Sequence, residues 1–320
     1  MKAATRSTYG LSNVLTVTSV NKPEPKDNEV LIRVHNTTVN RTDCGILTGK
    51  PYVIRAFVGL FKPSHQVPGT DFAGQIEAIG KKVTGFKVAD RVFGLYDEGL
   101  RSQAEYMTCR EDKALAKIPD GISYAEAAAS AEGAHYAYNF ITMVNLKPGD
   151  KALVYGATGA IGTAAVQLLK HFGIYVTAVG NTKNIELIKS LGADKTYDYL
   201  KEDFTADQER YHFIFDAVGK SSFDQCKKLL LPKGIYISSE LGPKGENLYL
   251  PLTTWLKGGK RVVFPIPKSC KRSILLMQEL LEQRKFKPVI EKVYPLEQVS
   301  EAYDYVLTGQ KTGNVLLSMS

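Results

Sequence analysis

The chain has 320 residues, 44% of them hydrophobic and 23% charged, which is typical of a globular protein. Domains usually contain about 100–200 residues, so the length predicts two domains. The net charge is +8, but the basic residues are dense only at 257–261 and 268–272, so we do not expect nucleic acid as a partner. No apolar run could span a bilayer and no signal-peptide pattern follows the first residues, so we expect a cytoplasmic protein with no membrane span.

The cysteines are few and far apart. Cys44, Cys109, Cys226 and Cys270 form no C-x-x-C pair. Free thiols in a reducing compartment are the simplest interpretation. A structural zinc site normally needs four clustered ligands, so this spacing also argues against one.

Up to about residue 120 the sequence is β-rich. Short strand-like runs at 30–34, 69–80, 88–94 and 104–108 are separated by turn residues and predict a small barrel or sandwich. After that the pattern changes. Ser123, followed by Glu126, predicts the start of a helix, and a second helix is expected over about 133–144.

From residue 151 onward strand-like and helical patterns alternate, which predicts a parallel, doubly wound sheet. The expected strands are 151–155, 174–179, 195–199, 213–217, 234–238 and 261–264. Helical patterns follow the first two of these strands. A further helix is expected over about 269–284, and a closing strand at 314–318.

One segment of this alternating region has the pattern of a dinucleotide-binding turn. The strand Lys151–Tyr155 leads into a turn with three glycines, and an amphipathic helix follows. Glycine lets the backbone approach a pyrophosphate, and the N-terminus of a helix offers free N–H groups. The predicted cofactor-binding residues of this turn are Gly156, Ala157, Thr158, Gly159, Ala160, Ile161 and Gly162. Thr158 occupies the place of the second glycine in the strict G-x-G-x-x-G motif, and a tight turn without a ligand is the alternative.

The end of the next strand favours NADP(H) over NAD(H). About 20 residues past the turn, an acidic residue usually binds the ribose 2′-hydroxyl of NAD. No Asp or Glu occurs between Lys151 and Ile185, and the sequence there is Gly180-Asn181-Thr182-Lys183. Thr and Lys side chains can bond to a 2′-phosphate, which a carboxylate would repel. The alternative is a solvated turn whose lysine faces water.

Several separate segments resemble the medium-chain dehydrogenase/reductase superfamily, in particular its zinc-free, quinone-oxidoreductase-like (zeta-crystallin-like) branch. The matching segments are 39–43 (VNRTD), 68–74 (PGTDFAG), 80–94, 190–194 (SLGAD), 198–199 and 216–219 (DAVG). Ala89 stands where the family usually has glycine.

The resemblance implies an α/β protein with a Rossmann doubly wound parallel sheet and a GroES-like β-rich domain. The GroES-like substrate domain would comprise residues 1–122 and be completed by 266–320, with the Rossmann NADP(H)-binding domain at 123–265. The cofactor would lie in the cleft between the domains. Relatives also suggest a homodimer through edge pairing of Rossmann sheets.

The same resemblance implies contacts to the cofactor outside the glycine turn. Asn181, Thr182 and Lys183 would contact the 2′-phosphate, and Tyr199 would lie by the adenosine. Ala217, Val218 and Gly219 would follow the cofactor, Phe264 and Ile266 would meet the nicotinamide carboxamide, and Lys311 and Asn314 would return to the cleft. For each of these residues, packing or a loop position is the alternative.

The resemblance also bears on metal binding. Zinc-dependent members place a cysteine near Asn40 and a histidine where Thr70 stands. Catalytic zinc typically needs three ligands, and the five histidines show no ligand spacing, so we expect no metal. His135 stands where relatives often have a threonine, and either a phosphate contact or packing is possible there.

The expected activity is an NADPH-dependent, zinc-independent reduction of a quinone or an α,β-unsaturated carbonyl compound. Negative charge that develops on the substrate oxygen needs a donor, for which Asn40, Tyr52 or a water held by them are candidates. Tyr52 could instead be an aromatic lid, and the apolar segment 53–61 could line a substrate pocket or belong to the core. An enoyl-thioester reductase and a non-catalytic, NADPH-binding or RNA-associated protein are the alternative functions.

Overall fold

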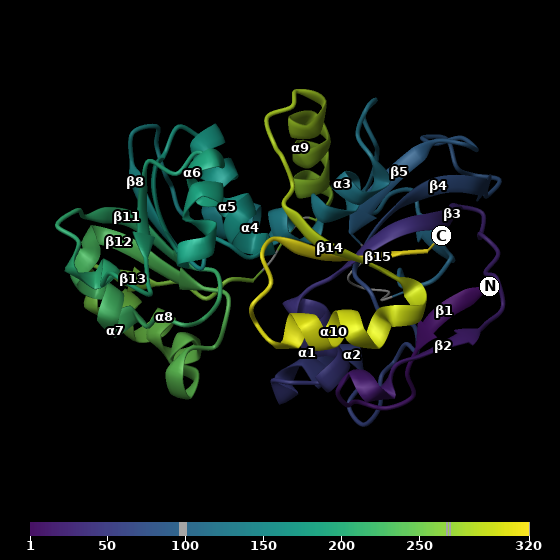
Figure 1. Ribbon diagram of the computed structural model, residues 1–320, viewed down its shortest axis with the longest axis horizontal. Helices are drawn as coiled ribbons and strands as arrows, with labels where there is room; N and C mark the ends of the chain where they lie inside the picture. Colours follow the sequence, from purple (N-terminus) through teal and green to yellow (C-terminus); the bar gives the residue numbers. More distant parts are fainter. Residues whose placement is uncertain (96–100, 267, 269, 320) are drawn as a thin grey trace. The chain divides into compact units, whose positions relative to one another are not determined.

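The computed structural model describes residues 1–95, 101–266, 268 and 270–319. Two units make up the chain: a first unit of Met1–Glu132 with Ser269–Ser320, and a second unit of Gly133–Lys268. Figure 1 shows the elements of both. Among the described residues, none of the helices has the length and apolar character needed to cross a bilayer.

The second unit is built on a six-stranded parallel sheet with the order β10-β9-β8-β11-β12-β13. Its strands are β8 (Lys151–Tyr155), β9 (Tyr175–Gly180), β10 (Lys195–Asp198), β11 (Tyr211–Asp216), β12 (Leu230–Ser238) and β13 (Arg261–Val262). Its helices are α4 (Glu132–Thr142, from the last residue of the first unit), α5 (Ala160–His171), α6 (Ile185–Ser190), α7 (Phe223–Cys226) and α8 (Glu246–Lys257).

This strand order is that of a dinucleotide-binding Rossmann fold. Counted along the chain from β8, the order reads 3-2-1-4-5-6, and it reverses direction between β8 and β11. Ligands of such sheets bind at the carboxyl ends of the strands next to this reversal. The buried side chains of Leu153, Ile214 and Tyr236 hold the strands around it together. The predicted doubly wound parallel sheet is therefore confirmed.

The first unit contains a seven-stranded sheet with the path β14-β15-β3-β4-β5-β7, in which β6 also pairs with β3. Its strands are β3 (Glu29–Val39), β4 (Asp71–Ile79), β5 (Arg91–Leu95), β6 (Tyr106–Arg110), β7 (Leu115–Lys117), β14 (Ile290–Pro295) and β15 (Asn314–Ser318); β1 (Lys2–Thr5) and β2 (Thr16–Ser19) form a separate pair. The helices are α1 (Arg41–Thr48), α2 (Arg55–Val58), α3 (Tyr124–Ala129), α9 (Cys270–Glu282) and α10 (Val299–Leu307).

The C-terminal part of the chain completes this sheet. Strand β15 pairs with β3 on one side, with Val315 opposite Val39, and with β14 on the other side. In Figure 1 the three strands lie next to one another although they come from opposite ends of the sequence. Val39 and Val315 share a buried apolar cluster with Leu47 and Tyr303. The tail is therefore part of the core of the first unit.

The predicted start of helix α3 is also confirmed. The backbone N–H of Ser123 donates to the Glu126 carboxylate at 2.9 Å, and the Ser123 hydroxyl accepts from the Glu126 N–H at 3.2 Å. This is a capping box, which satisfies two N–H groups at the helix end.

Helices α1 and α8 lie where the sequence analysis expected none, as do the short helices α2 and α7. Helix α1 begins directly after Asn40, inside the VNRTD segment. Helix α8 has its apolar residues on the exposed side: Leu252 and Trp255 are both 63% exposed, whereas Asn247 and Thr254 are buried. Sequence analysis assumes that the apolar side of a helix faces the core, and in α8 this assumption fails. Pro251 inside the helix is also a residue that usually ends one.

Candidate functional site

The glycine turn after β8 has the geometry of a phosphate site. Gly156 has a φ of +78°, a conformation that favours glycine. A Cβ at Gly162 would lie 2.1 Å from the carbonyl oxygen of Gly156, so only glycine lets α5 pack this closely on the turn. At Gly159, the residue before α5, a Cβ would meet nothing within 4 Å. An open backbone at the N-terminus of a 12-residue helix fits a pyrophosphate group.

The loop after β11 lies beside this turn and is held by one carboxylate. Asp216 is fully buried and accepts the backbone N–H groups of Val218 and Gly219 at 3.0 and 2.7 Å. The same carboxylate accepts from the N–H and the hydroxyl of Ser221, each at 2.7 Å. A Cβ at Gly156 would touch the Val218 side chain at 2.6 Å. The two predicted cofactor segments, 156–162 and 217–219, are thus brought together at the strand-order reversal.

A carboxylate that the sequence analysis did not consider, that of Asp198 at the end of β10, lies next to the segment after β9. Thr182 and Lys183 are exposed, and the Thr182 hydroxyl donates to the Asp198 carboxylate at 2.6 Å. Parallel pairing places Asp198 opposite Gly180, so the carboxylate lies at the same strand ends. The hydrogen bond from Thr182 lowers the pKa of Asp198. A hydroxyl has one hydrogen, so in this arrangement Thr182 does not donate to a phosphate.

The other residues of the second unit that were predicted to contact the cofactor lie outside the glycine turn and the loop after β11. Tyr199 follows β10, and its side chain is 47% exposed. Phe264 is half-buried and Ile266 is exposed after β13. His135 is buried, with its Nδ1 3.1 Å from the amide nitrogen of Asn139, so it packs inside the unit.

In the first unit, a buried polar cluster forms around Glu132. The amide nitrogen of Asn40 donates to Glu132 at 3.0 Å and to the Thr38 hydroxyl at 2.8 Å. The Thr70 hydroxyl lies 3.3 Å from the same carboxylate oxygen of Glu132. The ammonium of Lys311 donates to the amide oxygen of Asn40 at 3.0 Å. Sequence reasoning named Asn40 and Lys311 but missed Glu132, which directly precedes the Gly133-Ala134-His135 segment.

Burial shifts the pKa values of the ionisable groups in this cluster. It lowers the pKa of Lys311 to about 8, although the negative charge of Glu132 opposes the shift. Burial also raises the pKa of Glu132. The pKa of Asp71 is raised to about 7 by burial and by the charge of Glu132, despite hydrogen bonds from the backbone and hydroxyl of Thr38.

The donors of this cluster do not fit a catalytic zinc ion. Catalytic zinc binds thiolate, imidazole and carboxylate ligands, typically three from the protein. Asn40, Thr70 and Glu132 offer one amide, one hydroxyl and one carboxylate, and the Lys311 ammonium lies among them. In the part of the chain that the structure describes, no group of three or more His, Cys, Asp or Glu side chains could hold a metal ion.

Tyr52 lies on the surface of the first unit, in a short 3-10 helix, Tyr52–Ile54. Its side chain is 68% exposed, and the Arg55 guanidinium lies between its ring and that of Tyr9, 4.9 and 4.5 Å from the two ring centres. The apolar segment around it is largely exposed rather than core, with Phe57 at 84% and Phe61 at 90% exposure.

Asn314 anchors the C-terminal strand. It is 3% exposed, and its amide nitrogen donates to the carbonyl oxygens of Ala129 and Val289 at 3.2 and 3.1 Å. Both amide hydrogens are therefore used within the first unit.

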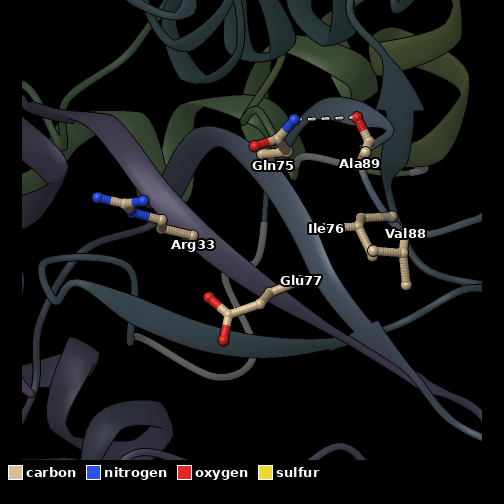
Figure 2. Close-up of a pocket in the computed structure, with 6 residues that line it drawn as sticks. All are labelled: Arg33, Gln75, Ile76, Glu77, Val88 and Ala89. Carbon is tan, nitrogen blue, oxygen red and sulfur yellow. Dashed lines mark hydrogen bonds between the residues drawn. The ribbon is translucent and has the colours of Figure 1, made fainter.

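An open surface hollow also lies on the first unit (Figure 2). It is lined by Arg33, Gln75, Ile76, Glu77, Val88 and Ala89. The Gln75 amide donates to the Ala89 carbonyl at 3.2 Å, and Ala89 has a φ of +71°. That left-handed conformation explains why glycine is usual at this position. None of the predicted site residues lines the hollow, and we assign it no role.

Comparison with known proteins identifies the family. Residues 26–132 match the alcohol dehydrogenase GroES-like domain family, and residues 191–317 match a family described as zinc-binding dehydrogenase. The chain is 32% identical over 329 residues to 2-methylene-furan-3-one reductase of Solanum lycopersicum, covering 99% of this chain and 79% of that protein. It is 30% identical to an NADPH-dependent alkenal/one oxidoreductase of Arabidopsis thaliana, with the same shares covered.

The solved structures agree on the fold. A quinone oxidoreductase from Coxiella burnetii matches with a TM-score of 0.88 at 23% identity, covering 100% of this chain and 99% of that one. The chain therefore belongs to the medium-chain dehydrogenase/reductase superfamily, in its quinone-oxidoreductase-like branch.

Proposed function

We propose that the protein is an NADPH-dependent, zinc-independent reductase that transfers hydride to a quinone or an α,β-unsaturated carbonyl compound. The observation that carries the proposal is the glycine turn 156–162, open at Gly159 and placed at the strand-order reversal. The names of the tomato and Arabidopsis relatives support the substrate class and the choice of NADPH. Zinc independence is supported by the donor set around Glu132, even though one matching family is described as zinc-binding.

The residues of the second unit would bind the cofactor. The backbone of 156–162 would hold the pyrophosphate, and 217–219 would run along it in the shape set by Asp216. Asn181 and the exposed Lys183 would contact the 2′-phosphate. Tyr199, Phe264 and Ile266 remain proposed contacts to the adenosine and nicotinamide ends.

In the reaction, bound NADPH supplies the hydride. The hydride adds to the β-carbon of the substrate, and the electron pair of the double bond moves toward the carbonyl oxygen. Tyr52 is our proton donor: its hydroxyl gives a proton to the α-carbon and is reprotonated by solvent. The exposed apolar segment 53–61 would contact an apolar substrate.

The experiment that tests this function has two parts. Nicotinamide fluorescence is followed while NADPH or NADH is added to the wild type and to Lys183→Ala, and turnover is measured with a panel of enones and quinones. We expect a preference for NADPH that collapses in Lys183→Ala, together with turnover of at least one enone. Equal binding of both cofactors would refute the NADPH assignment. Binding without any turnover would favour a non-catalytic cofactor-binding protein.

We also propose a homodimer formed through β13 and α8. Strand β13 is the edge of the parallel sheet, and α8 presents Leu248, Leu252 and Trp255 to solvent at 59–63% exposure. A second copy of the same edge and helix would pair the strand and cover this apolar face.

Light scattering on a size-exclusion column tests the dimer. We expect the wild type to be dimeric and Leu252→Glu to be monomeric. Leu200→Glu is the matched control, because Leu200 is 66% exposed after β10, at the opposite edge of the sheet. A monomeric wild type, or a dimer that survives Leu252→Glu, would refute this interface.

A further inference from the structure

The side chain of Asn40 has no hydrogen left for a substrate. A primary amide carries two hydrogens. In Asn40 one is donated to Glu132 and the other to Thr38, and its oxygen accepts from Lys311. Asn40 is also 5% exposed. The amide thus connects its neighbours and does not offer a donor of its own.

Lys311 has the donor that Asn40 lacks. An ammonium carries three hydrogens. Two of them go to the Asn40 amide oxygen at 3.0 Å and the Gly313 carbonyl oxygen at 2.5 Å. Within the described residues, no further acceptor takes the third. The two hydrogen bonds fix the position of the ammonium, and the residue as a whole is partly exposed.

Glu132 supplies the countercharge for this ammonium. The carboxylate is 2% exposed and is held by the amide of Asn40 and the hydroxyl of Thr70. The charges of Glu132 and Lys311 favour each other, and the Asn40 amide connects the two groups by hydrogen bonds. The chain Glu132–Asn40–Lys311 therefore fixes both the charge and the position of the ammonium.

We propose that Lys311 donates a hydrogen bond to the carbonyl oxygen of the substrate, and that Glu132 and Asn40 are the positioning residues that hold it there. This inference rests on the proposed reductase function. As hydride adds to the β-carbon, the C=C electron pair forms a double bond between the α-carbon and the carbonyl carbon, and the carbonyl π pair moves onto the oxygen. The N–H of Lys311 stabilises the resulting negative charge without giving up its proton. A preorganised cationic donor acts most strongly at the point where charge develops.

The ammonium must be charged to act, so the rate should depend on pH. The ionisable groups that face Lys311 are Glu132, Glu291, Asp43 and Cys44. With the pKa of Lys311 lowered to about 8, kcat should fall as the pH rises through about 8. Glu132 raises the pKa of Lys311, so Glu132→Gln should move this decline to lower pH. Asp71 also titrates, with its pKa raised to about 7, and must be separated from Lys311.

The test measures kcat for an enone against pH in the wild type, Lys311→Met, Lys311→Arg and Glu132→Gln, with NADPH affinity from fluorescence. We expect Lys311→Met to lower kcat by about 10²-fold while the Kd for NADPH stays within about twofold. Lys311→Arg should keep more activity and lose the alkaline decline, because arginine stays charged. A decline caused by Asp71 would persist in that variant. Lys285→Met, at an exposed lysine, is the matched control and should change nothing.

Three results would overturn the inference: a Lys311→Met enzyme with kcat within about threefold of the wild type, a loss confined to NADPH affinity, or an alkaline decline retained in Lys311→Arg. Each of these leaves the reductase function standing. If the wild type reduces no enone or quinone, the proposed function fails, and this inference fails with it.

Discussion

The substitution Gly159→Ala should weaken NADPH binding while leaving the stability of the fold nearly unchanged. Gly159 has φ −79° and ψ 178°, which alanine adopts readily, and its Cβ would touch no protein atom within 4 Å. The same open space is where we place the pyrophosphate. Gly159→Ala should therefore fold nearly as well as the wild type, with a loss of about 0.5 kcal/mol from the poorer helix cap, and should bind NADPH poorly.

The size of the effect follows from the contacts at stake. Losing one hydrogen bond between a backbone N–H and a charged phosphate costs about 2 kcal/mol, or about a 30-fold rise in Kd. At an NADPH concentration about 100 times the wild-type Kd, binding stabilises the wild type by about 2.7 kcal/mol. The same concentration would stabilise Gly159→Ala by about 0.9 kcal/mol. For a chain of 320 residues the difference corresponds to about 3 °C in Tm.

Thermal unfolding with and without NADPH measures both quantities. Gly162→Ala is the contrasting variant: its Cβ would lie 2.1 Å from the Gly156 carbonyl oxygen and 2.7 Å from Ala157 Cα, so the backbone must move. Such overpacking costs about 1–3 kcal/mol and should lower Tm even without cofactor. If Gly159→Ala gains as much Tm from NADPH as the wild type does, the pyrophosphate does not approach this glycine.

Three more predictions concern single side chains. Asp198→Asn removes the carboxylate beside Thr182, whose charge would repel a 2′-phosphate. The affinity for NADPH should therefore rise by about three- to tenfold, with little effect on the affinity for NADH. Equal changes in both affinities, measured by fluorescence titration, would contradict this prediction. Although burial opposes it, hydrogen bonds from the Glu209 N–H and from Lys195 lower the pKa of Asp207 to about 2. That contribution to stability is present above about pH 4 and lost as the pH falls toward 2, so urea unfolding of Asp207→Asn should show a weaker acid dependence than the wild type. Tyr52→Phe should lower kcat by about 10²-fold with unchanged NADPH affinity, and full activity would exclude Tyr52 as the proton donor.

Local patterns were enough to predict many elements. The strand Lys151–Tyr155 and the closing strand Asn314–Ser318 have the predicted bounds, and Ser123 caps α3 as expected. In each case a contiguous run carries the information. The strand expected over 261–264 is shorter, Arg261–Val262, since only Ile235 and Tyr236 of β12 pair with it. Helix α8 was missed because its apolar residues face outward.

In the candidate site, too, the part formed by a continuous segment could be predicted and the part formed by distant residues could not. The glycine turn is a continuous segment, so its sequence alone reveals it. The contact between Thr182 and Asp198 arises from the parallel pairing of β9 and β10, and the bond between Asn40 and Glu132 joins residues 92 positions apart. Such contacts depend on tertiary structure. The position of Glu132 directly before Gly133, in a segment already singled out for His135, was the one available signal.

The position of β15 sets the order in which the protein can be completed during synthesis. Strand β3 ends at Val39, and its partner begins at Asn314, about 275 residues later. At about 5–20 residues per second, the ribosome needs about 14–55 s to cover that distance. Throughout this time residues 36–39 of β3 lack their partner strand β15, although β6 can already pair with residues 29–33 of the same edge. The contiguous second unit is complete once Lys268 has been added. On the nascent chain, residues 36–39 of β3 therefore form the stretch of this edge that stays open longest to pairing with another strand.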